Sequence, residues 1–527
     1  MSKIIFVIIK FILNERINKI IINFLFLFLF LLGIIIYKDF GIGWDEISDR
    51  SFGNYLSKII VSFFSLEIAE YYSASNLFIE KYNRYPNIFF EYTSSFFEFF
   101  LRKYFNIITT NKEVFELRHF LIFNFFLIGC YYFVKLNKKI YCNFFISLIT
   151  LLFLITLPRV FGHSFFNSND LIHMSFTIIN VYYGMKFIEK KEPRTILILI
   201  IISCININSR ISAIFIIGLI LCFDYLFLYK KKKNFFVHLF IFTITILLTY
   251  ITNPYLFKNS IVQNLHLLTV LFKHPNSSEV LYLNTFINSK DLPWHYLIIW
   301  ILATFPIVTI LMSFLSTFFL ILYFNKNIIK KNYILIYTNC FFFLPIIFGI
   351  IFSSAHLDAE RYAMFTYPYI IINIGFLLKF LILNKKFFMI YLSILIIFIS
   401  INVYNLYSFH PYQMIYFNEL FRKNAHLNFD IDYWGVVNRD AIKFILKSSD
   451  KELIKIYAIS STPLENSKWI LDENDAKRIL ITDDISKADY ILNNFRRYQK
   501  VIDNNKYELY YTIQKNNIKI LEVYTNK

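Results

Sequence analysis

Two adjacent carboxylates, Asp45 and Glu46, follow the first long apolar run of the chain, residues 20–36. In that place they would stand at a membrane–water boundary, within reach of a lipid headgroup and of a water-soluble partner. Ionisable side chains so close to hydrocarbon are costly unless they are paired or used. One charge is usually enough to end a transmembrane helix, so the pair indicates more than a polar stop. A carboxylate in this position can serve as a general base.

Composition predicts that these acids belong to a polytopic α-helical membrane protein. The 527 residues are 57% hydrophobic and 20% aromatic. A spanning helix needs about 20 mostly apolar residues, and such runs recur as far as residue 405. We predict about eleven spans, at residues 19–38, 118–134, 140–157, 171–187, 194–208, 211–228, 235–252, 293–323, 333–352, 364–383 and 387–405.

Basic loops orient the predicted bundle. With the N-terminus inside, alternate loops are rich in lysine and would all lie on the cytoplasmic side, as the positive-inside bias requires. Those loops are residues 135–139, 186–194, 230–233, 326–331 and 385–386. The net charge of +18 belongs to the membrane part, because residues 407–527 hold eighteen Lys/Arg and sixteen Asp/Glu, leaving +2. The charge therefore does not imply a nucleic-acid partner.

Two large segments lie outside the predicted spans. Residues 39–117 form a first outer loop, in which residues 87–105 and, less regularly, residues 51–72 predict amphipathic helices lying in the interface plane. Residues 406–527 predict a small extracytoplasmic α/β domain. Its predicted elements are a helix at 440–447, strands at 454–460, 478–482 and 490–493, and a hairpin of 507–513 with 518–524.

The unusual polar residues of the membrane part all fall on the outer side of this topology. Besides the acidic pair, they include Arg118, His119, Arg159, His163, Asp170, Arg210, His356 and Arg361. A transporter would be expected to spread ionisable groups through the bilayer midplane and onto both sides. Their collection at one interface favours an enzyme that acts there.

Glycosyl transfer from a lipid phosphate fits this set of residues. Such a donor keeps its isoprenoid tail in the bilayer and its phosphate at the interface. Asp45 would take the proton from an acceptor hydroxyl as it attacks the anomeric carbon, with Glu46 beside it orienting or binding a metal. The leaving phosphate needs positive charge, which Arg159, Arg210 or Arg361 can supply through bidentate contacts. One base without a covalent nucleophile gives inversion of configuration.

The chain resembles the GT-C glycosyltransferases, in particular bacterial relatives of the dolichyl-phosphate-mannose protein mannosyltransferases and the lipid A aminoarabinose transferases. The resemblance covers about residues 1–405 in architecture. It is carried by Trp44-Asp45-Glu46, by the outer-loop amphipathic segments and by Asp170. It implies that Asp45 is the base and that Asp170 helps to shape the site. Asn-Ser-Asn precedes Asp170 where the family leads us to expect Asn-Pro-Lys, so phosphate binding is left to the arginines.

Further stretches resemble those of a less characterised bacterial branch, for which neither donor nor acceptor follows. These stretches are residues 159–163, 292–296 and 432–435. The resemblance implies a polyprenyl-phosphate-sugar-dependent hexosyl- or pentosyltransferase in the bacterial inner membrane. Its partners would be the lipid-linked sugar, membrane lipids and an unidentified glycolipid, polysaccharide or protein acceptor. The Asp-Tyr-Trp-Gly stretch at 432–435 fits a packing turn better than an acceptor contact.

Several residues allow a second interpretation. A divalent metal is a minor alternative for two sets, His163, Asp170 and His173, or Asp45 and Asp49. Arg118 can snorkel to headgroups instead of serving a site. Glu91 fits a solvated helix face better than a site role.

Other function classes also stay open. A transporter or flippase of lipid-linked saccharides would need charged pairs inside the helices, where the sequence has almost none beyond Asp224. A non-catalytic membrane assembly protein would not need Asp45 and Glu46. An oligosaccharyl ligase, a nearer relative in chemistry, would use basic residues on the outer face.

Overall fold

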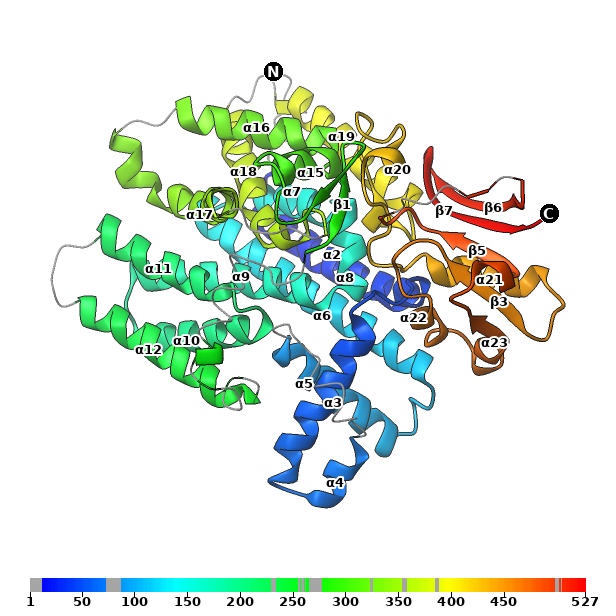
Figure 1. The fold of residues 1–527 in the computed structure, drawn as a ribbon. Helices are drawn as coiled ribbons and strands as arrows, with labels where there is room; N and C mark the ends of the chain where they lie inside the picture. Colours follow the sequence, from blue (N-terminus) through cyan, green and yellow to red (C-terminus); the bar gives the residue numbers. More distant parts are fainter. Residues whose placement is uncertain are drawn as a thin grey trace.

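The computed structural model is a helical bundle with a small sheet at its C-terminal end (Figure 1). It describes residues 12–72, 87–228, 234–254, 256, 260, 262–264, 277–322, 326–352, 358–383, 388–497, 502–503 and 505–527. His356 lies outside these residues. Within them, six helices are long and apolar enough to cross a membrane, or eight if each of two bent pairs counts as one span. The structure is therefore consistent with an integral membrane protein.

Each of the eleven predicted apolar segments is helical. The helices are α2 (Glu15–Ile36), α6 (Asn111–Tyr141), α7 (Phe144–Ile155) with α8 (Pro158–Phe166), α9 (Ser168–Glu189), α10 (Pro193–Ser209), α11 (Ala213–Leu228), α12 (Asn234–Thr252), α15 (Tyr296–Thr304) with α16 (Ile307–Leu322), α17 (Lys326–Ile351), α18 (Tyr367–Leu383) and α19 (Phe388–Ser408). Three of them, α9, α10 and α11, are not among the six to eight spans. The number eleven therefore stays a prediction.

Two prolines account for the bent pairs. The α7–α8 pair bends by 70° and the α15–α16 pair by 119°. Pro158 begins α8, and Pro306 immediately precedes α16. Proline disfavours helical backbone in the residue before it, and both preceding residues, Leu157 and Phe305, are extended. The break at Leu157 and Pro158 thus turns α8 away from the direction of α7.

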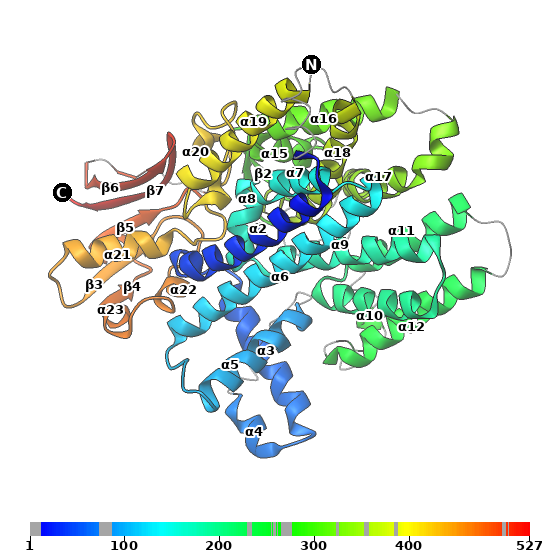
Figure 2. The same ribbon diagram turned by 180° about the vertical axis from the view of Figure 1, so that it is seen from behind.

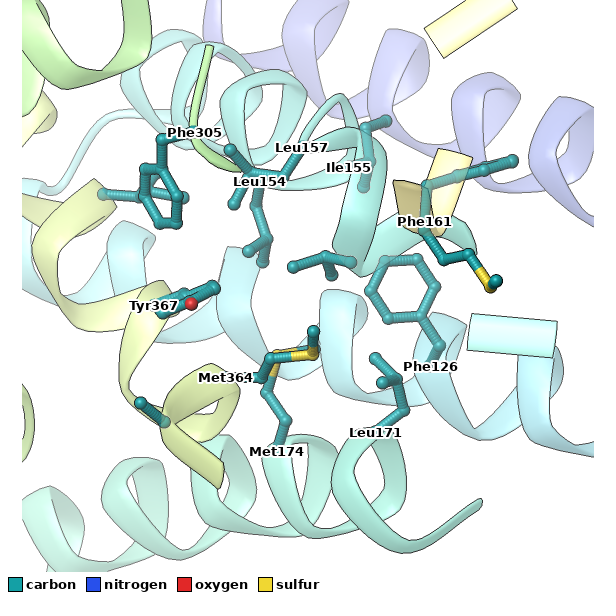
Figure 3. Packing of buried hydrophobic residues seen from close by; sticks show 14 of the residues in the cluster. Phe126, Leu154, Ile155, Leu157, Phe161, Leu171, Met174, Phe305, Met364 and Tyr367 are labelled. Atoms are coloured by element: carbon teal, nitrogen blue, oxygen red, sulfur yellow. The ribbon is translucent and has the colours of Figure 1, made fainter. Parts of the chain in front are cut away.

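Helix α9 lies at the centre of the bundle. It packs against α6, α10, α11 and the short 3-10 helix η3 (Arg361–Thr366). Figure 3 shows Leu171 and Met174 of α9 among buried side chains from neighbouring elements, including Phe126 of α6 and Met364 of η3. Peripheral helices such as α2, α12, α16 and α19 instead expose many large apolar side chains, as lipid-facing helices do.

The first outer segment folds into three helices, α3 (Glu46–Ser62), α4 (Leu66–Tyr71) and α5 (Ile88–Lys103), which project from the bundle (Figures 1 and 2). The amphipathic helix predicted at 87–105 is confirmed as α5. Asn87 caps this helix by accepting the N–H of Phe90. The expectation for Glu91 was wrong. The acidic and serine side of α5 packs inward against α3 and α6, whereas Phe96, Phe97 and Phe100 are exposed.

The C-terminal part contains a five-stranded mixed sheet in the order β4-β3-β5-β7-β6. Its elements are α21 (Asn438–Ser448), β3 (Ile454–Ala458), α22 (Glu465–Lys468), α23 (Glu473–Lys477), β4 (Ile479–Ile481), β5 (Tyr490–Asn493), β6 (Tyr507–Lys515) and β7 (Ile518–Asn526). Strands β3, β4 and β5 are parallel, and β7 is antiparallel to both β5 and β6. The predicted helix, strands and hairpin are confirmed.

Two hairpins have turn residues with positive φ. Asn516 and Asn517 join β6 to β7 with φ of 46° and 65°, and asparagine tolerates this backbone well. A second hairpin, β1 (Glu279–Tyr282) with β2 (Thr285–Asn288), was not predicted. Its turn, Leu283-Asn284, has φ of 49° and 64°, and leucine there gives no sequence signal for a turn.

Candidate active site

The two adjacent acids face in different directions. Asp45 immediately precedes α3, and its side chain is 18% exposed. Glu46, the first residue of α3, is buried. It accepts the N–H of Gly43 at 2.6 Å, and its other oxygen lies 3.1 Å from Nε2 of His119. Because consecutive positions differ by about 100° around a helix, the turn that buries Glu46 leaves Asp45 facing the neighbouring polar cluster.

Arg361 lies next to Asp45. Its Nη1 is 3.7 Å from the Asp45 carboxylate, and its Nη2 is 2.8 Å from Asp358. The same Nη2 donates to the hydroxyl of Tyr362, and the guanidinium stacks on the Trp434 ring at 4.8 Å. Arg361 therefore holds a fixed, largely buried positive charge beside the one acid of the pair that reaches solvent.

Arg210 and Asp170 form a second ion pair. Asn167 holds Asp170 in the first turn of α9, since its amide oxygen accepts the Asp170 N–H and its Nδ2 donates to the carboxylate at 2.8 Å. The Arg210 guanidinium lies 4.9 Å from the Tyr362 ring, which Arg361 contacts at 4.7 Å. Four predicted site residues, Asp45, Asp170, Arg210 and Arg361, thus gather around one tyrosine.

The residue immediately before Asp170, which differs from the one that the resemblance leads us to expect, has a structural role. Asn169 stands where lysine was expected, and its Nδ2 donates to the buried Asp49 carboxylate at 3.2 Å. This bond connects the start of α9 to the first turns of α3. Asparagine here joins two site-bearing helices and adds no positive charge.

Arg159 has a different environment from the other two arginines. It is buried, its Nη1 lies 3.1 Å and 3.2 Å from the two Glu360 oxygens, and its Nε donates to the Tyr416 carbonyl at 3.0 Å. Burial raises the pKa of Glu360, and the Arg159 charge opposes this shift. Glu360 immediately precedes η3, so the pair fixes the segment that presents Arg361.

The histidines of the predicted metal set have separate hydrogen-bond partners. The ring of His163 faces Asn167 at 3.0 Å and the Tyr433 hydroxyl at 3.2 Å. His173 faces Asn206 at 2.8 Å through Nδ1. Among the residues that the structure describes, three His, Cys, Asp or Glu side chains nowhere gather in a way that could hold a metal ion.

Arg118 and Glu91 form a buried bidentate pair. Both Arg118 Nη atoms lie 2.9 Å from a Glu91 oxygen, and Nη1 also donates to Ser94. The side chains are 2% and 0% exposed. The interpretation that Arg118 snorkels to headgroups is therefore wrong, and so is the prediction that Glu91 lies on a solvated helix face. The pair joins α5 to α6 behind the site.

Breaking this pair should destabilise the protein strongly. Glu91→Gln leaves the buried Arg118 charge without its directly bound anion, and we expect a loss of about 3–5 kcal/mol, measured by thermal unfolding in detergent. Glu189→Gln is a suitable control, because its partner Lys139 and Glu189 are both partly exposed and such pairs contribute about 0–1 kcal/mol. Equal effects of the two changes would contradict the structural role of Glu91.

The C-terminal part contributes residues that the sequence did not single out. Arg496 donates from Nη2 to Asp358 at 2.7 Å and from Nη1 to the Tyr433 carbonyl, and its guanidinium lies 4.2 Å over the Trp44 ring. Two arginines, 496 and 497, lie shortly after the predicted strand at 490–493 and were the available signal, since the carboxyl ends of parallel strands commonly face sites.

The turn at residues 432–435 brings Trp434 to the site. The Asp432 carboxylate accepts three backbone N–H bonds, from Gly435, Val436 and Val437. Burial nevertheless raises the pKa of Asp432 to about 6. Burial likewise raises the pKa of Asp430 to about 6, although it accepts the N–H of Arg497. The expected packing turn is present, and its tryptophan covers Arg361.

The cluster combines a partly exposed carboxylate with fixed guanidinium groups and aromatic walls. Such a set can remove a proton from a hydroxyl and hold a phosphate at the same time. No family model matches the chain, and no curated protein matches it.

Proposed function

We propose that the protein is an inverting GT-C-like glycosyltransferase that moves a sugar from a polyprenyl-phosphate donor to an extracytoplasmic acceptor. The observation that carries this proposal is the pairing of Asp45 with Arg361 at 3.7 Å, beside Arg210 and Asp170. A carboxylate and two guanidinium groups lying close together beyond the end of an apolar helix support this proposal, because a base and a phosphate clamp would need to be neighbours there. A glycolipid, a polysaccharide or a protein would supply the acceptor hydroxyl.

Each group has a defined part in the reaction. Asp45 accepts the acceptor's proton as the hydroxyl oxygen bonds to the anomeric carbon. The bond from that carbon to the phosphate oxygen breaks at the same time, and the electron pair leaves with polyprenyl phosphate. Arg361 and Arg210 stabilise the growing negative charge on the phosphate. Their present carboxylate partners, Asp358 and Asp170, would share them with the donor.

A defined assay separates this activity from transport. Purified protein in lipid nanodiscs is given a panel of polyprenyl-phosphate hexoses and pentoses together with envelope glycolipid and polysaccharide fractions. The proposal requires sugar on an acceptor and an equal amount of polyprenyl phosphate released. Movement of intact donor across a proteoliposome bilayer, without its cleavage, would instead support a flippase.

We further propose that the protein spans the bacterial inner membrane with its C-terminal domain outside. Six or eight spans would place both termini on the same side of the membrane, whereas eleven place them on opposite sides. Whether α9, α10 and α11 cross therefore determines the side on which the C-terminal domain lies. The contacts of the C-terminal part favour opposite sides, and hence an odd number of crossings such as eleven. Arg439 binds carbonyls at the C-terminal end of α2, a helix that crosses once and begins at Glu15.

A reporter fusion measures this orientation. A reporter that is active only in the cytoplasm, fused after Lys527, should give no signal, because the lysine-rich loops set the opposite end of the bundle inside. The same reporter fused in the basic loop at residues 230–233 should be active. Activity at Lys527 would mean that an odd number of the predicted helices does not cross.

A further inference from the structure

The loop that carries Asp45 is held along its backbone by the C-terminal domain. Arg439 of α21 donates from Nη1 to the carbonyls of Lys38 (3.0 Å) and Phe40 (2.7 Å) and from Nη2 to the carbonyl of Asp39. Its Nε is bound to the neighbouring Asp440 carboxylate at 2.9 Å. One buried side chain thus joins three successive carbonyls between α2 and the site.

These carbonyls need such a partner. The last turn of a helix leaves carbonyl groups without intrahelical donors, and its end carries partial negative charge. Lys38 and Asp39 end the short 3-10 helix η1 (Tyr37–Asp39), which follows α2 directly, and Phe40 comes immediately after it. The planar fork of arginine can reach several acceptors at once, which the compact ammonium of lysine cannot do in the same geometry. Arg439 therefore caps the end of η1 from 400 residues away in the sequence.

Further contacts follow the same loop toward Asp45. A Cβ atom on Gly41 would overlap the Val436 carbonyl oxygen, so only glycine permits this approach. The Trp44 carbonyl accepts from Nδ2 of Asn466 at 2.9 Å. Figure 2 shows the end of α2 reaching the base of the C-terminal domain beside α21 and α22. The loop has little freedom to move independently of that domain.

We propose that the C-terminal domain sets the position of the base, with Arg439 as a positioning residue that acts through the backbone of residues 38–40. This inference rests on the proposed function for its effect on catalysis. The contact itself does not depend on it. The domain would then be part of the active site in every turnover and not a separate acceptor-binding module.

Arg439→Gln tests the proposal through its effect on turnover. A base displaced by about 1 Å costs on the order of 100-fold, so we expect kcat to fall about 10- to 100-fold while the KM for the lipid donor changes little. Arg439→Lys should recover part of kcat. The control is Arg478→Gln, because Arg478 also donates to backbone carbonyls, those of Ser449 and Lys451, but only within the C-terminal domain.

Hydrogen–deuterium exchange provides a second readout that is independent of activity. Backbone amides of residues 40–46 should exchange faster in Arg439→Gln than in the wild type, and Arg478→Gln should leave them unchanged. Faster exchange with an unchanged kcat would overturn the positioning role, and so would a lower kcat with unchanged exchange. Faster exchange in a protein whose wild type transfers no sugar would reject the proposed function and leave the contact standing.

Gly41→Ala keeps the test usable if Arg439 variants fail to fold. The added methyl must move the loop away from Val436, and we expect the same pattern of faster exchange and lower kcat. Gly218→Ala is its matched control, because a Cβ at Gly218 meets no atom within 4 Å. Wild-type exchange and kcat in Gly41→Ala would overturn the proposal.

Discussion

Asp45→Asn is expected to lower the rate of sugar transfer about 100- to 10,000-fold, which is the usual loss when general-base help is removed, while the protein still inserts and folds. The substitution keeps the shape of the side chain. Asp45 is partly exposed and its ion pair with Arg361, at 3.7 Å, is loose, so little native stability depends on its charge. The measurement is kcat with the preferred lipid-linked donor in nanodiscs, with thermal unfolding of the same preparation.

The control for Asp45→Asn is Asp472→Asn, a 71% exposed carboxylate on the surface of the C-terminal domain, whose ion pair with Lys112 is screened by solvent. It should keep normal kcat. Near-normal transfer by Asp45→Asn would move the base elsewhere. Asp170, paired with Arg210 in the same cluster, or Glu46, held by His119 and the Gly43 amide, would then be next.

Arg361→Lys should reduce kcat/KM by about 100- to 1,000-fold, the usual effect of removing one group that stabilises developing charge. Lysine keeps the charge but loses the planar fork that contacts Asp358 and faces Asp45 together. Binding of the polyprenyl-phosphate sugar should weaken in parallel, and the loss should appear with every acceptor because the donor is shared.

The other arginines allow this expectation to be checked. Arg210→Lys should act in the same way, while Arg194→Lys, an exposed arginine at the start of α10, should have no effect. Arg159→Lys should chiefly lower stability, since Arg159 is enclosed by Glu360 and the Tyr416 carbonyl. Normal donor binding and turnover in both Arg361→Lys and Arg210→Lys would remove the clamp from the mechanism.

Long apolar runs made most of the helical architecture predictable. Every predicted apolar segment is a helix, and the C-terminal strands lie within a few residues of their predicted positions. These signals are local, because they depend on the composition of one window of sequence. The convergence of Asp45, Asp170, Arg210 and Arg361 was also predictable, since the topology assigned all four to one end of the bundle.

The features that sequence did not predict depend on contacts between distant segments. Glu91 lies on an amphipathic helix, and the pattern alone does not say which side faces the protein. Its burial follows from Arg118, which arrives from another helix. Arg439 likewise occupies an ordinary position on a short helix, and its carbonyl partners at residues 38–40 are far away in the chain.

The central position of α9 has a consequence for how the chain enters the bilayer. Its buried surface includes Asp170, His173 and Asn180, and polar side chains like these oppose spontaneous partitioning of a lone helix from the translocon into lipid. Partners for them come from the segment that follows, such as Arg210 and Asn206. If α9 crosses the bilayer, as we propose, we expect its insertion to be coupled to the synthesis of α10, so that these helices enter the bilayer as a group.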